Sequence, residues 1–175
     1  MAGRRRRWSA IVADWQPFLA GSLTGRLELH ATHYHAAPDH EGRGWITLHG
    51  EQILSFEPLT YLMRVYGYQA ELAALGEEAQ GAMDAAIAVA HREGLADLWT
   101  FEHAVAHYPE LAVEDALASH DTVTRGLAMV DRRLGKRRLA TLELHVEESP
   151  IVQRMLNLRL EAEGLTEHRS APAPA

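Results

Sequence analysis

The sequence predicts an α+β protein, in which an N-terminal helix and a three-stranded antiparallel meander pack against a mostly helical C-terminal two-thirds. Two observations carry this prediction. Between residues 26 and 56, apolar and polar side chains alternate in short runs separated by turn residues, which is typical of strands. After Pro58 the chain becomes rich in alanine and in helix-capping residues. Because no break in composition divides the chain, we expect a single domain over residues 8–164.

The predicted helix and meander lie in residues 8–56. Apolar residues at helical spacing predict a short helix that begins at Trp8 and ends near Pro17. From Arg26 to His35, alternate residues share one face, which predicts the first strand. Two further strands are expected at residues 45–49 and 52–56. Turn residues fill positions 38–44, and a tight turn is expected at Gly50–Glu51.

The C-terminal two-thirds is expected to be a series of helices. Asp121 and Ser149 are predicted N-caps, because their side-chain oxygens can accept from the free amides of a first helical turn. Gly76, Gly94 and Gly164 are placed where helices end. The expected helices cover residues 59–75, 77–92, 97–108, 113–118, 121–134, 136–146 and 150–164. In the first of these, Tyr61, Val65 and Tyr68 form a core-facing stripe, and the tyrosines, Tyr66 included, are expected to cover the sheet.

Composition narrows the class of protein. The chain has 175 residues, of which 47% are hydrophobic, and a formal net charge of -7, which fits a globular protein. It has no cysteine, which excludes disulfides, thiolate metal ligands and a cysteine nucleophile. Residues 1–7 are expected to be a flexible basic arm with no apolar run behind it, so we expect neither a signal peptide nor a membrane anchor. Residues 165–175 are expected to be a disordered Pro/Ala tail, and the protein is expected to be cytoplasmic.

The basic residues are concentrated in two short segments. Arg4–Arg7 and Arg132–Arg138 hold nine of the 17 cations, so the rest of the chain is strongly acidic. Such a distribution argues against a protein coated with nucleic acid and allows only a local contact with an anionic partner. The second segment is the more informative, because it follows the apolar stripe of the predicted helix 121–134.

This second basic segment has two interpretations. Its last three cations open a predicted helix, where they oppose the helix macrodipole and require compensation. In the first interpretation an anion-binding site is formed by Arg133, Lys136, Arg137 and Arg138. In the second, Asp131 and carboxylates such as Glu114, Asp115 and Glu143 neutralise the cations in a joint between two helices. We favour the joint, because charge-assisted Asp–Arg pairs often connect stacked helices.

The same region carries a family resemblance. The matching residues are Ala118-Ser119, Asp121, Val123, Arg125, Leu127-Ala128 and the block Asp131-Arg-Arg-Leu-Gly-Lys-Arg-Arg-Leu139. Together they resemble the signature of a family of small uncharacterised bacterial cytosolic proteins, with Asp-Arg-Arg-x-Gly-Lys-Arg-Arg-Leu as its most specific part. The resemblance extends over residues 8–164 and implies a cytosolic single-domain protein. It brings no known activity, so it implies no catalytic residue.

Histidines offer a candidate metal site in the meander. The chain has eleven histidines, and His33 and His35 share one face of the first strand. His40, in an acidic loop, could complete a set of ligands for zinc or a similar ion. The alternative is that these are ordinary surface histidines, because no His-Glu-x-x-His motif occurs. His103 and His107 lie one helical turn apart, and we expect them at a solvated or half-buried helix end.

No reaction is predicted. The sequence lacks a nucleophile elbow, a P-loop and a dinucleotide-binding glycine motif, which argues against an enzyme. Our first hypothesis is a non-enzymatic interaction or regulatory module whose helical portion contacts another protein, without a cofactor and without a membrane. The alternatives are binding of nucleic acid or another polyanion through Arg132–Arg138, and a histidine-dependent, metal-binding hydrolase.

Overall fold

The structure, a computed structural model, describes residues 6–34, 42–76 and 78–166. It confirms the predicted fold class, since an N-terminal helix is followed by a three-stranded antiparallel sheet and then by helices. Arg6 pairs with Asp14, and Leu165 packs against the core. The other residues of the predicted arm and tail lie almost wholly outside the described part, as do the segment 35–41 and residue 77.

The sheet is a meander with strand order β1-β2-β3. Its strands are β1 (Leu27–His33), β2 (Gly42–Leu48) and β3 (Glu51–Phe56). The β2–β3 turn lies at His49 and Gly50, whose φ angles of 53° and 81° give the left-handed pair of a tight hairpin turn. The turn therefore comes one residue earlier than expected. Strand β2 begins at Gly42, before the predicted start at residue 45. Within it, Gly44 allows the Phe101 ring to approach, because a Cβ atom at this position would lie 2.5 Å from the ring.

Eight α-helices occur in the described residues. They are α1 (Trp8–Trp15), α2 (Pro58–Ala74), α3 (Ala79–Arg92), α4 (Leu98–His107), α5 (Val113–Ala118), α6 (Thr122–Met129), α7 (Lys136–Thr141) and α8 (Pro150–Glu163). The predicted N-cap Asp121 accepts from the Val123 and Thr124 amides, and Gly164 ends α8 with a φ of 69°. Ser149 stands at the predicted cap position, but its side chain makes no cap hydrogen bond.

Two predicted helices end five residues early in the structure. The helix expected over 121–134 ends at Met129, because the next three residues pair with the chain after α1. The helix expected over 136–146 ends at Thr141. Leu142 follows with extended backbone angles, and Leu142 and Leu144 pack against the main core.

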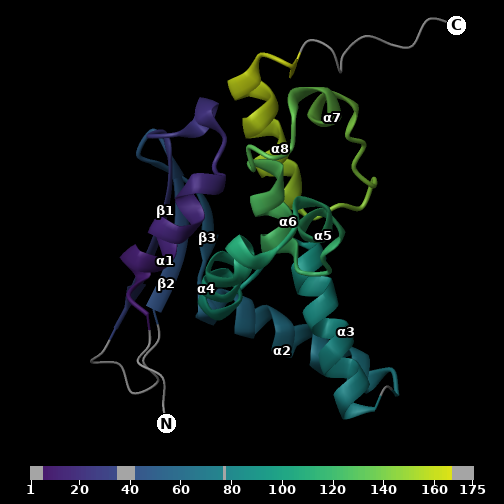
Figure 1. Cartoon of the computed structure of the whole chain (residues 1–175). Helices are drawn as coiled ribbons and strands as arrows, with labels where there is room; N and C mark the ends of the chain where they lie inside the picture. The colour runs from purple at the N-terminus through teal and green to yellow at the C-terminus, as the bar shows by residue number, and fades with distance from the viewer. Residues whose placement is uncertain (1–5, 35–41, 77, 167–175) are drawn as a thin grey trace, which may run out of the picture.

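The main core lies between the sheet and α8, with α4 and α6 at its centre (Figure 1). Phe101 of α4 stacks on Phe56 of β3 at 4.3 Å between ring centroids and contacts Trp8 of α1 at 5.3 Å. Helices α2 and α3 form a separate pair, seen at the bottom of Figure 1, with a small core of their own around Tyr61, Val65, Ala86 and Ala90. No helix of the described residues is long and apolar enough to cross a membrane.

Candidate functional site

Asp131 is the centre of a buried polar joint. Its side chain is almost completely buried and accepts the Tyr108 hydroxyl at 2.7 Å. Arg133 donates to it from Nη2 at 2.6 Å, from Nε at 2.9 Å and from its backbone amide at 2.7 Å. The Asp131 carboxylate is the main cause that raises the pKa of Arg133. Burial and then Asp131 raise the pKa of Tyr108, which keeps its hydroxyl protonated as a donor.

The joint connects three separate parts of the chain. Leu19 and Asp131 form an antiparallel bridge, in which the Arg132 amide donates to the Phe18 carbonyl at 2.7 Å and the Ala20 amide donates to the Val130 carbonyl at 2.9 Å. The Arg133 guanidinium lies 4.4 Å from the centre of the Phe18 ring and donates to the Leu111 carbonyl at 2.8 Å. The segment after α6 is therefore tied both to the N-terminal part and to the segment after α4.

A second ionic cluster closes the C-terminal end of α8. Glu163 accepts the Ser22 hydroxyl at 2.7 Å and forms ion pairs with Lys136 at 2.7 Å and with Arg159 at 3.0 Å. Burial alone would raise the pKa of Glu163, but the hydrogen bonds from Lys136 and Ser22, with the charge of Arg159, lower it below its ordinary value. Glu163 therefore compensates the charge of Lys136 at the start of α7, a pairing that was not predicted from the sequence.

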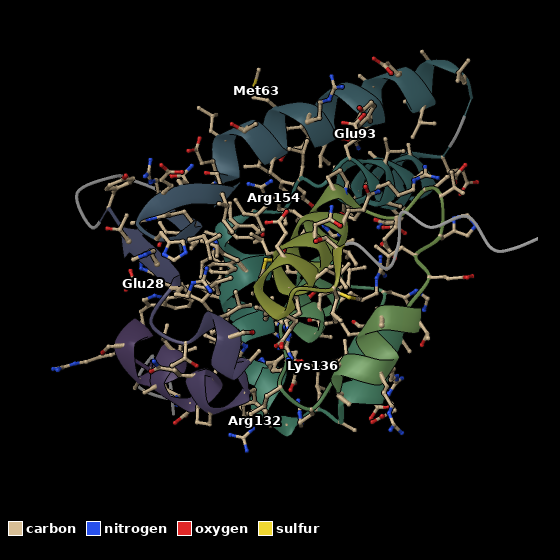
Figure 2. The ribbon with its side chains drawn as sticks, turned by 90° about the horizontal axis from the view of Figure 1, so that it is seen from above. Glu28, Met63, Glu93, Arg132, Lys136 and Arg154 are labelled. Carbon is tan, nitrogen blue, oxygen red and sulfur yellow. The ribbon has the colours of Figure 1, made fainter. Side chains whose placement is uncertain are left out.

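Three of the four predicted anion-binding residues are paired with carboxylates of the same chain. Arg133 holds Asp131, Lys136 holds Glu163, and Arg138 donates to Glu114 at 2.7 Å, as the joint interpretation expected of that glutamate. In the part of the chain that the structure describes, Arg137 has no side-chain partner. Arg132 has none there either, and Figure 2 shows it pointing outward at the edge of the molecule. Anion binding at these residues stays a prediction.

The meander histidines are only partly described. His33 lies at the end of β1, where its Nε2 is 3.1 Å from a Glu102 oxygen of α4. His35 and His40 lie outside the described residues. Among residues 6–34, 42–76 and 78–166, no three metal-ligating side chains gather. A zinc site at His33, His35 and His40 stays a prediction, and elemental analysis of untagged protein is its direct test.

A groove of about 740 Å³ brings other histidines together. His91 of α3, which the sequence analysis did not single out, lines it together with His103 and His107 of α4. The last two rings stack at 4.1 Å, and Nδ1 of His107 lies 2.9 Å from the His103 carbonyl, which can accept its hydrogen. Burial lowers the pKa of His91, although the charges of Asp121 and Asp97 act in the opposite direction. His103 and His107 therefore both lie in the C-terminal half of α4 and line the groove.

Helix α2 presents an apolar stripe to solvent. The stripe consists of Leu59, Met63, Tyr66, Ala70 and Ala73. All five are exposed, the first three by 65%, 70% and 55%, and Figure 2 shows Met63 on the outer side of its helix. The expectation that Tyr66 covers the sheet is therefore wrong. Tyr61 and Val65 are buried as predicted, but they pack against α3.

The stripe could have been read from its spacing. Its members are separated by four, three, four and three residues, which places all five within about 80° of one another on a helix with 3.6 residues per turn. The stripe predicted from the sequence to face the core is the neighbouring one, which consists of Tyr61, Val65 and Tyr68. Periodicity alone identifies two apolar faces on α2, and only the tertiary structure shows which of them is covered.

Fold and joint together define a small α+β protein in which a buried Asp–Arg–Tyr cluster fixes the helical part to the N-terminal part. The chain belongs to the SF0329 protein family, whose profile matches residues 7–160. Comparisons with curated proteins and with solved structures gave no match. The family membership agrees with the resemblance seen in the sequence, whereas the role of residues 131–139 as a family signature stays a prediction.

Proposed function

We propose that this protein is a non-enzymatic interaction module, acting in the cytoplasm, whose contact surface is the α2 stripe. The observation that carries the proposal is the exposure of Leu59, Met63 and Tyr66 on one face of a helix. Scattered exposed apolar residues are ordinary, but a contiguous row on a helix is typical of a protein–protein contact. A cysteine-free chain suits a reducing compartment.

The polar chemistry of the protein supports the same conclusion. Two buried or largely buried carboxylates hold cations of the basic segment, because Asp131 pairs with Arg133 and Glu163 pairs with Lys136. Arg133 and Lys136 of the basic segment therefore have a structural role in our proposal. The stripe, in contrast, contributes little to either hydrophobic core.

Photo-crosslinking tests the proposal. A photoactivatable amino acid is placed at Met63, in cells that produce the protein, and a matched control carries it at Glu28, an exposed position on β1 (Figure 2). We expect adducts of discrete mass from position 63 and none of these from position 28, with loss of the adducts when Tyr66→Asp is added. The same adducts at both positions, or none at position 63, would overturn the proposal.

Polyanion binding is the second candidate, and the exposed Arg132 and Arg137 favour it. Together with Arg133, Lys136 and Arg138 they would form a basic surface that contacts phosphates and loses affinity steeply with added salt. The test is a titration with short DNA and RNA at low salt. Arg132→Ala with Arg137→Ala should abolish binding while leaving the fold intact, and an absence of binding by the unmodified protein would exclude this candidate.

A further inference from the structure

We infer that the α2 stripe is occupied by the α2 stripe of a second copy of this chain, in an antiparallel pair around a twofold axis near Tyr66. The inference rests on the proposed function and names its partner. A twofold interface uses the same surface on both copies, so that surface must be complementary to itself. Spacing, size and charge of the stripe each satisfy this requirement.

The spacing of the stripe fits a helical partner. Alternating steps of four and three residues are the a/d pattern by which two helices pack along a shared seam. Neither hydrophobic core uses this face of α2, because Tyr61, Val65 and Leu72 on another face of the helix pack with α3. A narrow a/d seam left exposed beside a covered face indicates that a further helix lies along it.

The sizes of the stripe residues make it complementary to itself. Large side chains, Leu59 and Met63, occupy its N-terminal half, and small ones, Ala70 and Ala73, its C-terminal half. In an antiparallel pair centred on Tyr66, Leu59 lies opposite Ala73 of the second copy and Met63 opposite Ala70. On both sides of the central Tyr66 pair, large then meets small, whereas a parallel pair would place large against large at one end and leave a gap at the other.

Charge also favours a second copy. Helix α2 carries only two charged residues, Arg64 and Glu71, and both lie more than about 100° around the helix from the centre of the stripe. Burying a charge without a partner is costly, so an uncharged seam requires an uncharged partner surface. The same seam on a second copy is such a surface, and pairing through it brings no like charges of α2 into contact.

Other occupants fit less well. The segments outside the described residues, at 1–5, 35–41, 77 and 167–175, contain no leucine, isoleucine, valine or aromatic residue, so they offer no apolar seam. A lipid surface attracts helices whose apolar face is flanked by lysine and arginine, and α2 has a single cation. Its 17 residues span only about 25 Å, which places the interface at the small end of the size range and makes a reversible dimer the expected state.

Single cysteines test both the partner and the orientation. The natural chain has no cysteine, so every introduced thiol is the only one in its chain. With a short thiol-specific crosslinker, Tyr66→Cys should form a covalent dimer by itself. Leu59→Cys and Ala73→Cys should each remain monomeric alone and form a crosslinked pair when mixed. Glu28→Cys is the control that should not crosslink.

The other possible results of the crosslinking experiments would contradict the antiparallel dimer. Crosslinking of Leu59→Cys or Ala73→Cys to itself indicates a parallel pair, and it contradicts the antiparallel model. If no stripe position crosslinks in purified protein while the photo-crosslinked adducts at position 63 have a mass other than two chains, the second copy is excluded and the proposed function stands. If neither the cysteine crosslinking nor the photo-crosslinking gives a product, the antiparallel dimer and the proposed function are both excluded. Sedimentation of the protein with neutral lipid vesicles would instead indicate a membrane surface.

Discussion

Asp131 joins three segments, because its carboxylate binds Tyr108 and Arg133 and its backbone pairs with Leu19. It is 1% exposed, and its carboxylate accepts from two described neighbours that are themselves fixed, Tyr108 by burial and Arg133 by stacking on Phe18. A buried charge without partners costs several kcal/mol, so the cluster is stable only as a whole. At the residue scale, internal pairing accounts for Arg133, Lys136 and Arg138 of the basic segment.

Removing the carboxylate tests this account of the joint. Asp131→Ala leaves the Tyr108 hydroxyl buried without an acceptor and Arg133 without its counter-charge, and we expect a loss of about 3 kcal/mol in the free energy of unfolding. Urea denaturation measures it. The control is Arg138→Ala, which breaks the exposed pair with Glu114 and should leave stability almost unchanged. Equal effects of the two substitutions would contradict a structural joint.

Glu163 should make stability depend on pH. Its folded-state pKa lies below the ordinary value of 4.5, so its contribution is fully present above pH 4.5 and is lost as the pH falls through the lowered pKa. Glu163→Gln should therefore reduce stability at pH 7, by about 2 kcal/mol if its hydrogen bonds with Lys136 and Ser22 weaken. The difference from the natural protein should shrink on acidification, and a difference independent of pH from 7 to 3 would be inconsistent with this role.

At the scale of elements, helices α6 and α8 approach closely because Gly126 has no side chain. A Cβ atom there would lie 2.9 Å from Cγ2 of Ile151, a branched side chain that cannot easily move. We expect Gly126→Ala to destabilise the protein by about 1–3 kcal/mol. Gly67→Ala, in α2 with open space around it, should stabilise by about 0.5–1 kcal/mol through helix propensity. Thermal unfolding of the two variants checks the opposite signs.

Capping residues near in sequence predicted most helices, whereas contacts between residues far apart in sequence set the end of α6. Asp121 and Gly164 act within one helical turn, so the sequence revealed both helix limits. The early end of α6 depends on Phe18 and Ala20, which are far from Asp131 in the sequence. Sequence distance also limits what could be predicted of the joint. Arg133 is two residues from Asp131, so this pair could be predicted from the sequence. Tyr108 and Glu163 reach the two ionic clusters only through the tertiary structure.

At the scale of the whole molecule, the protein has a well-packed body and a projecting helix pair whose outer face is uncovered (Figure 1). The body needs no further partner to explain its buried charges. The uncovered stripe on α2 is not accounted for by the fold. A second copy of the chain would cover it, because the spacing, the side-chain sizes and the lack of charge of the stripe all suit pairing with itself. The resulting dimer should dissociate on dilution.

The molar mass in solution tests this claim most directly. Sedimentation equilibrium over a range of concentrations should show the natural chain of 19.5 kDa in reversible equilibrium with a species of twice that mass. Met63→Glu should be monomeric at all concentrations, because it buries a charge in the seam. Leu75→Glu, which changes an exposed leucine outside the stripe, should behave like the natural chain. A mass of 19.5 kDa for the natural chain at every concentration would contradict the account.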